Sequence, residues 1–508
     1  MNQSSVFPLT LATALLQSLH HVLALSAEPC HALRHQVASL IAPFYTTPLT
    51  PATTCHFERE LRGLLDECGR LILQTVYNHL EPENPQDAPK HSQRDRQDYV
   101  RKNSKTLNRG GIATLFGTIQ LQRCLYEPLQ DARDDDQPSF APLERHLGIV
   151  AGNATPALAE RVGRLAAQQT QQEMLQWLQR EHHVRWSVGV LRNVTAAVSG
   201  GIAAHLQAVQ RQTLLDWLEQ ARQSKGRGRV VLAVGRDGLM LPIRQESHYK
   251  EGGVATLSVY DRRGRRLGTL YLAEMPQPMQ ATLSADLTAL LRDVLTAWEG
   301  PLPRLVYLTD AGYHPTQYFR EVLQRMDNPR VPGQRLQWLW IIDFYHAASY
   351  VTKLAQVLFS EAKQQYAWAR RMRHLLRDEA RGVQRVLGSA AQCYGMKSRT
   401  KAEAKAYSEA YGYLRMHSAE MKYSEYKRSG LPIGSGVTEA GCKVVFTQRF
   451  KESGMKWSIV GGEVILRLRV AVLSGVWEAV YRKHLNHRPE VARTTLLAIT
   501  APTDEKAA

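Results

Sequence analysis

The spacing of apolar and polar positions sets one section of the chain apart from the rest. Between residues 228 and 344, apolar residues occur in short runs bounded by turn residues, which is typical of strands. Strands are predicted within 228–241, ending at Asp237, at 254–261 and 266–274, within 304–312, ending at Asp310, and at 336–344; helices are predicted at 281–300 and 316–326. The order of strand, hairpin pair, helix, strand, helix and strand predicts an α/β fold with a mixed five-stranded sheet.

The segments before this section are mostly helical in pattern. Residues 56–80 and 155–222 repeat apolar positions every three or four residues, whereas 112–126 predicts two short strands. Thr170 and Ser187 are predicted to cap two of the three short helices expected at 155–222. Three such helices suit a helix-turn-helix or a plain packing unit, and the pattern does not decide between them.

Five regions follow from these patterns. They are 1–150, helical with a short β-hairpin; 151–225, trihelical; 226–346, rich in strands; 347–430, helical and basic; and 431–508, a Gly-rich loop with a long helical tail from about 437 to 485. Polar segments at 82–97 and 131–137 are predicted to be loops. Within 361–430, 15 Lys and Arg outnumber 7 Asp and Glu, so this face either is solvated or binds phosphates.

Charge and cysteine usage narrow the class of protein. Lys and Arg number 64 against 47 Asp and Glu, a net charge of +17 that favours a polyanionic partner over a merely solvated surface. Six scattered cysteines without a C-x-x-C pair argue against a zinc ribbon or a disulfide framework and suit a reducing compartment. The apolar start of the chain lacks a preceding basic residue and contains two histidines, so we expect a packed helix there and no signal peptide or membrane span.

Two aspartates occupy corresponding places in the predicted sheet. Asp237 is expected at the end of the first strand and Asp310 at the end of the fourth, and these strands are expected to be neighbours. Adjacent carboxylates repel each other unless a cation offsets them, and hard oxygen ligands favour Mg²⁺ or Mn²⁺. Glu439, in "LPIGSGVTEAGCK" (431–443), can supply a third carboxylate for a two-metal site. Gly434 and Gly436 would let DNA approach closely.

The same segments resemble a known family. "GRDGLMLP", "LTDAGYH", "WIIDFYHAASYV" and "PIGSGVTEAGCKVVFTQRFKESGMKWS" are similar to the catalytic blocks of DDE transposases of bacterial insertion sequences, of the Kra-type lineage that is distantly Mutator-like. The likeness extends over most of the chain from about residue 112. Arg236 departs from the family pattern, which usually has an apolar or small residue before the first Asp-Gly.

The resemblance implies a fold, a reaction and a set of partners. It implies an RNase H-like core with flanking helices, begun at 226–346, interrupted by the helical insertion at 347–430 and completed at 431–508, after a mostly helical DNA-binding region. It implies a catalytic and metal-binding triad of Asp237, Asp310 and Glu439, with two Mg²⁺ or Mn²⁺ ions. It also implies a cytoplasmic, nucleoid-associated bacterial protein that acts, as a homodimer or larger assembly, on terminal inverted repeats and target double-stranded DNA.

Further residues are candidates for DNA contact or for a supporting role. The candidates for DNA contact are Lys443, Arg449, Lys451, Lys456, Trp457, Arg370, Arg371, Arg373 and Arg192. Trp457 either stacks on an unpaired base or anchors the tail in the core. Asp343 and His346 either support the site or cap and pack a strand-to-helix junction. Two other functions stay open: a nuclease on the same fold that does not join strands, and a transposase-derived protein that only binds DNA.

Overall fold

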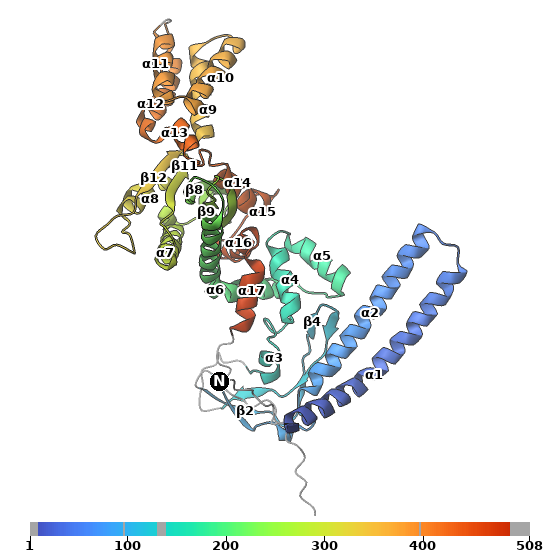
Figure 1. Ribbon diagram of the computed structural model, residues 1–508. Coiled ribbons are helices and arrows are strands. Elements are labelled where there is room, and N and C mark those ends of the chain that lie inside the picture. Colours follow the sequence, from blue (N-terminus) through green and yellow to red (C-terminus); the bar gives the residue numbers. More distant parts are fainter. Residues whose placement is uncertain (1–8, 95–96, 130–138, 396–397, 488–508) are drawn as a thin grey trace, which may run out of the picture. The chain divides into compact units, whose positions relative to one another are not determined.

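The computed structural model describes residues 9–94, 97–129, 139–395 and 398–487, in two compact units (Figure 1). One unit comprises Met1–Val198 and Lys483–Ala508, and the other comprises Ser199–Arg482. The acidic segment at 131–137 lies outside the described residues. None of the helices in the described ranges combines the length and the apolar character that crossing a bilayer would require.

The first unit begins with two long helices, α1 (Leu9–Thr46) and α2 (Pro51–His79), which pack against each other. The rings of Phe44 and Phe57 lie 4.4 Å apart between the two helices. At the far end of α2, the Asn78 side chain donates to the Gln120 carbonyl at 3.0 Å and accepts from the Gln122 amide at 2.8 Å. These bonds tie the helix pair to the strands that follow.

Short strands form three small sheets in this unit. The strands are β1 (His91–Arg94), β2 (Gln97–Arg101), β3 (Thr106–Leu107), β4 (Ile112–Thr114), β5 (Gly117–Ile119), β6 (Gln122–Arg123) and β7 (Tyr126–Pro128), paired as β1-β2-β7, β3-β6 and β4-β5. The predicted hairpin at 112–126 is therefore present but is one part of a larger set. The loop predicted at 82–97 is partly wrong, because it holds η1 (Pro85–Asp87) and β1. The pattern missed β1 because this strand is held by backbone pairing with β2 and has no alternation of apolar and polar residues.

Four helices follow: α3 (Pro142–His146), α4 (Pro156–Ala166), α5 (Gln171–His182) and α6 (Val188–Gln223), of which the last belongs to the second unit from Ser199 onward. Thr170 and Glu173 form a capping box on α5, and the Ser187 hydroxyl accepts from the Val190 amide at 3.3 Å, so both predicted caps are confirmed. The last helix was expected to be short, but α6 runs for 36 residues.

The second unit is built on a five-stranded mixed sheet, which confirms the α/β class and the mixed sheet predicted from the strand order. The strands are β8 (Val231–Leu241), β9 (Lys250–Tyr260), β10 (Arg266–Glu274), β11 (Arg304–Thr309) and β12 (Trp338–Ile342), in the order β10-β9-β8-β11-β12. β8, β9 and β10 are antiparallel, and β11 is parallel to β8 and to β12. The apolar runs of β8, β9 and β11 are almost entirely buried, as a sheet covered on both faces requires.

Helices occur between and after these strands. Between the strands lie η2 (Pro278–Gln280), α7 (Ala281–Ala297), α8 (Tyr313–Glu321) and η3 (Leu323–Arg325). After β12 comes the insertion: α9 (Phe344–Leu358), α10 (Ala362–Asp378), α11 (Gly382–Tyr394), α12 (Lys401–Met416), η4 (Ser418–Glu420) and α13 (Tyr423–Arg428). Within it α9 packs against α10, α11 and α12 (Figure 1). The stacked rings of Tyr350 and Tyr413, 4.0 Å apart, join α9 to α12.

The C-terminal part returns to the sheet through several short helices. They are α14 (Gly436–Cys442), a π-helical turn (Lys443–Thr447), α15 (Gln448–Phe450), α16 (Ile459–Leu473) and α17 (Trp477–Asn486). The single long helix expected here is wrong, because the chain leaves helical geometry at 451–458. There Trp457 pairs as a bridge with Ile243, and its carbonyl accepts from the Arg244 amide at 2.8 Å.

Candidate active site

Asp237 and Asp310 extend from neighbouring parallel strands at the same level. The last paired residues of β8 and β11 are Gly235 and Leu308. Asp237 lies two residues further along β8, and Asp310, two residues after Leu308, directly follows the end of β11. Asp237 was expected to end its strand, but it lies inside β8, where it pairs with Val254. The prediction failed because the antiparallel partner β9 continues six residues beyond the end of the pairing with β11.

Glu439 lies on α14, which is held close to β8 and β9. The Thr438 hydroxyl shares a 2.8 Å hydrogen bond with that of Thr256 on β9. A Cβ at Gly235 would collide with the Thr438 hydroxyl, and one at Gly441 would lie 3.2 Å from the Tyr271 ring. Side chains at either glycine would push α14 away from the sheet, so these two glycines fix the position of the helix that carries Glu439.

The electrostatics of Asp237 show that the three carboxylates share one region. The pKa of Asp237 is raised to about 6, chiefly by burial and to a smaller extent by the charges of Asp310 and Glu439. The Gly238 amide, 2.7 Å from Oδ1, and the Cys442 thiol donate to the carboxylate and offset part of that rise. The carboxylate of Asp310 accepts from the Gly312 amide at 2.8 Å. Like charges therefore meet where β8, β11 and α14 converge.

The donor chemistry of this cluster suits a hard divalent cation. Mg²⁺ binds through one or two protein carboxylates and keeps several waters. In the structure, Asp237 and Asp310 each accept a hydrogen bond from a backbone amide, and an ion can compete with these bonds. In the described part of the chain, no three Asp, Glu, His or Cys side chains approach closely enough to enclose one ion. The residues thus fit ions held by few protein ligands at a time, and not a closed three-ligand cage.

Two further polar residues border the cluster and were missed in the sequence. A Cβ at Gly238 would collide with the Glu251 carboxylate of β9, and the charge of Glu251 contributes to the raised pKa of Cys442. His314 Nε2 lies 3.7 Å from Glu251 Oε2, and its Nδ1 is buried without a partner among the described residues. Neither residue has a spacing that marks it in the sequence, although His314 follows Asp310 by four positions.

Asp343 joins the insertion to the Gly-rich loop. Its carboxylate caps α9 by accepting from the Tyr345 amide at 2.7 Å, and it also accepts the Ser435 hydroxyl. The ring of His346 packs against Tyr350 and Tyr413. The geometry therefore matches the capping and packing interpretation of this pair. Tyr413 also donates its hydroxyl to the Asp310 carbonyl at 2.8 Å, which fixes the backbone at the cluster.

The two glycines chosen from the loop differ in their surroundings. A Cβ at Gly434 would lie 2.9 Å from the Tyr345 ring, so close approach applies there. Gly436 begins α14 without positive φ, and a Cβ added to it would meet no atom within 4 Å among the described residues. Gly436 therefore has neither an unusual backbone conformation nor a close contact with the described residues.

Arg236, the departure from the family pattern, is a buried support beneath the cluster. It is 1% exposed and donates to the Ser284 hydroxyl and to Gln280 Oε1, each at 2.9 Å. Its guanidinium lies 4.5 Å from the centre of the Tyr318 ring. These contacts bind β8 to α7 and α8 at the residue that precedes Asp237.

The candidate DNA-contacting residues fall into exposed and buried sets. Lys443, Lys451 and Lys456 are exposed in the second unit; Arg192 is exposed in the first, where it donates to Gln171 at 3.2 Å. Arg370, Arg371 and Arg373 lie on α10.

Arg449 and Trp457 are the exceptions. Arg449 is 2% exposed and lies 5.1 Å from the Trp457 ring, so the expected phosphate contact is wrong for this conformation. The Trp457 indole donates to the Phe450 carbonyl at 3.1 Å and packs 4.5 Å from the Phe450 ring. These contacts match its interpretation as an anchor for the tail.

The fold and the cluster define a class: a mixed α/β protein with three carboxylates gathered where two parallel strands and a helix meet. No family model matches the chain. The chain is similar to a protein of Streptococcus gallolyticus named "UPF0236 protein in vanSb 3′ region", with 22% identity over 379 residues, 73% of this chain and 74% of that protein. The likeness is distant, and that name states no activity.

Proposed function

We propose that the protein is a metal-dependent DDE transposase, which cleaves the ends of a transposon and joins them to target DNA. The observation that carries the proposal is the convergence of β8, β11 and α14, which carry Asp237, Asp310 and Glu439; the charges of the other two carboxylates act on Asp237. A protein that gains nothing from such a cluster would not keep three repelling carboxylates together.

The strand order supports an RNase H-like core as part of the proposal. Three antiparallel strands are followed by two parallel ones, in the order 3-2-1-4-5 counted from β8; one aspartate lies within the first strand and the other directly follows the fourth. The third carboxylate comes from a helix after the insertion. This arrangement is what the family resemblance implies for the catalytic core.

Each residue of the site has a proposed role. Asp237, Asp310 and Glu439 would hold two Mg²⁺ or Mn²⁺ ions, which activate a hydroxyl nucleophile and stabilise the departing oxygen in phosphodiester chemistry. The Gly238 and Gly312 amides orient the two aspartates. Cys442 is a positioning residue: burial and the charge of Asp237 raise the pKa of its thiol far above neutral, so the thiol stays protonated, donates a hydrogen bond to the carboxylate and is no nucleophile.

The partners follow from the reaction. The substrates are double-stranded DNA at terminal inverted repeats and in the target, and paired ends favour a homodimer. A nuclease on the same fold would cleave without joining, and a transposase-derived binder would do neither. The presence of all three carboxylates speaks against a pure binder.

The proposal is tested with Asp310→Asn. Asparagine keeps an oxygen for the Gly312 amide but removes the charge, so we expect a folded protein that binds DNA and cleaves end DNA at least ~100-fold more slowly. Asp327→Asn, an exposed change in the same unit, is the control. Cleavage and joining are scored on labelled DNA that includes the sequence flanking the reading frame, with Mg²⁺. Equal cleavage by wild type and Asp310→Asn would refute the site, and cleavage without joined product would favour the nuclease.

A further inference from the structure

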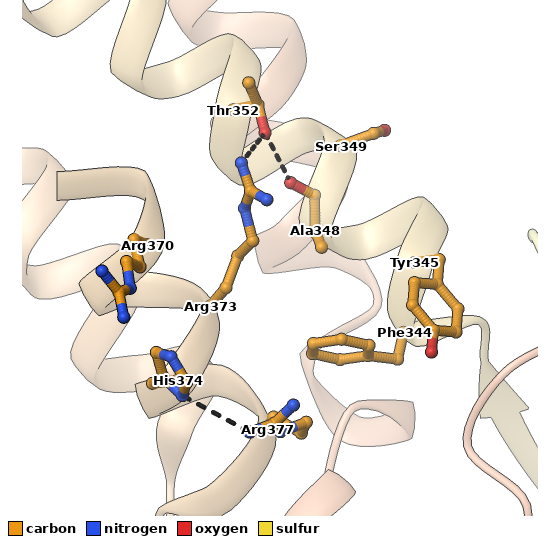
Figure 2. A pocket seen from close by; sticks show the side chains of 9 residues that line it. All are labelled: Phe344, Tyr345, Ala348, Ser349, Thr352, Arg370, Arg373, His374 and Arg377. Atoms are coloured by element: carbon orange, nitrogen blue, oxygen red, sulfur yellow. Dashed lines mark hydrogen bonds between the residues drawn. The ribbon is translucent and has the colours of Figure 1, made fainter. Parts of the chain in front are cut away.

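A pocket of about 380 Å³ lies between α9 and α10, at the base of the insertion (Figure 2). The wall formed by α9 carries aromatic and small side chains, and the wall formed by α10 carries basic ones. Its lining residues are Phe344, Tyr345, Ala348, Ser349 and Thr352 of α9, and Arg370, Arg373, His374 and Arg377 of α10. The basic residues recur at helical spacing along one face of α10, so their clustering is a property of the fold.

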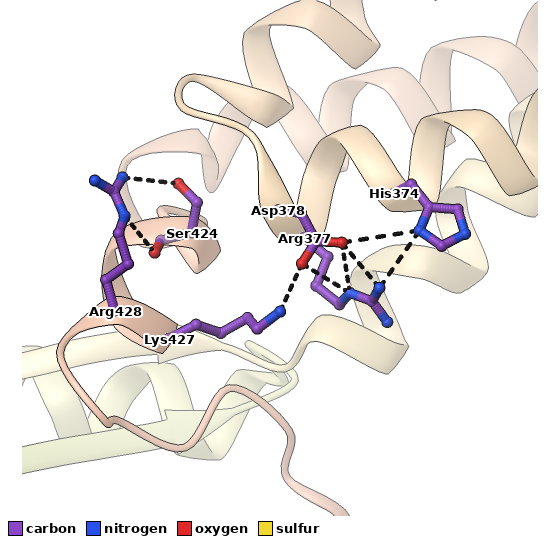
Figure 3. Close-up of polar contacts among 6 residues, drawn as sticks. All are labelled: His374, Arg377, Asp378, Ser424, Lys427 and Arg428. Atoms are coloured by element: carbon purple, nitrogen blue, oxygen red, sulfur yellow. Dashed lines mark hydrogen bonds and ion pairs between the residues drawn. The ribbon is translucent and has the colours of Figure 1, made fainter.

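The positive charge of the pocket is only partly neutralised. Arg377 pairs with Asp378, with Nη2 at 2.8 Å from Oδ2 (Figure 3). Asp378 also accepts Lys427 at 2.5 Å, and these two cations hold its pKa well below its usual range. One carboxylate therefore serves two cations. Among the described residues, Arg370 and Arg373 pair with no carboxylate, so the pocket keeps two uncompensated guanidinium groups.

Arg373 is pre-positioned inside the pocket. Its Nη2 donates to the Thr352 hydroxyl at 3.0 Å across the space between the helices, as Figure 2 shows. Its Nε is buried and has no hydrogen-bond partner in the described ranges. A buried donor without an acceptor costs free energy, and a bound anion would supply that acceptor.

We infer that this pocket binds one phosphate group of a nucleic-acid backbone. Guanidinium groups bind phosphate through paired, parallel hydrogen bonds, and the two free arginines supply more donors than the protein uses. Tyr345, 67% exposed at the pocket, offers a ring beside the phosphate. The assignment to nucleic acid rests on the proposed function.

The pocket is connected to the loop that leads to Glu439. Tyr345 contacts Gly434, and the residue before α9, Asp343, accepts the hydroxyl of Ser435 directly before α14. A backbone phosphate bound here would thus be held by the same helix start that anchors the loop. Of the three arginines proposed from the sequence, Arg370 and Arg373 line the pocket, whereas Arg371 does not.

The experiment compares two double variants with equal loss of charge. Arg370→Ala with Arg373→Ala empties the pocket of its free cations; Arg371→Ala with Lys401→Ala removes two exposed cations of the insertion that do not line it. Affinity for a duplex of arbitrary sequence, about three helical turns long, is measured against salt concentration. We expect the slope of log K against log salt to become shallower by about 0.9 for the pocket variant, the value for one lost phosphate contact, and by less than half of that for the control.

The outcomes separate the pocket from the wider function. If the slope of log K against log salt is the same for both double variants, whether unchanged or equally shallower than for wild type, the pocket assignment is overturned while DNA binding stays intact. Arg370→Ala alone, at an exposed position, gives the same reading if the double variant does not fold.

A second arm uses inorganic phosphate as the probe. Melting temperatures are compared in sodium phosphate and in sodium chloride at equal ionic strength. If phosphate stabilises wild type and control but not the pocket variant, while all DNA slopes agree, the pocket binds free phosphate and the nucleic-acid assignment is overturned. If wild type binds no DNA at all, the proposed function fails, and this arm alone decides whether the pocket takes phosphate.

Discussion

Replacing Asp237 by asparagine should stabilise the free protein while abolishing its chemistry. The carboxylate is half-buried, and it faces Asp310 and Glu439. Asparagine retains an oxygen that can accept from the Gly238 amide and from the Cys442 thiol, but it removes one of three mutually repelling charges. Sites that bind metal and substrate commonly reduce the stability of the empty protein in this way.

The size of the effect follows from the pKa. The pKa of Asp237 rises from 3.8 to about 6 on folding, chiefly through burial. Each pKa unit corresponds to about 1.4 kcal/mol, so the charged carboxylate costs the folded state about 3 kcal/mol at pH 8. Between the two pKa values the folded state binds more protons than the unfolded state, so stability falls as pH rises through this window. Below pH 3.8 the difference vanishes.

Denaturant unfolding at a series of pH values measures this directly. The gain of Asp237→Asn over wild type should grow from near zero at pH 4 to a plateau of about 3 kcal/mol above pH 7. Because a chain of two units can unfold in two steps, only the transition of the sheet-containing unit should move. Asp327→Asn should show no such pH dependence. A pH-independent difference, or a loss of stability at pH 8, would refute the reasoning.

Three other substitutions test the support of the site. Gly434→Val should displace the Tyr345 ring and lower the cleavage rate per folded molecule, whereas Gly436→Val, at an open helix start, should leave cleavage and melting temperature nearly unchanged; equal effects in the two assays would contradict this difference. Arg236→Ala should lower the free energy of unfolding by about 3 kcal/mol, because it leaves a cavity and unpaired polar partners. An unfolding free energy within about 0.5 kcal/mol of wild type would show that Arg236 supports nothing.

Much of the sheet could be predicted from the sequence because its strands are buried apolar runs. β8 and β11 are adjacent as expected, and both aspartates follow from that adjacency. The end of β8 could not be predicted, since a strand ends where its partner ends and β9 lies elsewhere in the sequence. The length of α6 could not be predicted either, because its local sequence pattern indicated only a short helix.

The details of the site depend on contacts between distant segments. Gly235 and Gly441 matter because α14 returns to lie on the sheet after the whole helical insertion, and no local signal at either glycine shows this. Arg449 was expected at the surface because arginine usually is, and its burial against Trp457 depends on the fold of the tail. Glu251 and His314 enter the site for the same reason.

The central claim is that Asp237, Asp310 and Glu439 form one divalent-metal site, and Mn²⁺ binding tests it most directly. The electron paramagnetic resonance signal of free Mn²⁺ is titrated with wild type, Asp237→Asn, Asp310→Asn, Glu439→Gln and the control Asp327→Asn at pH 8. We predict that wild type and control remove Mn²⁺ from solution equally, while each change in the cluster weakens binding at least tenfold. Binding by all three cluster variants equal to that of wild type would contradict the account.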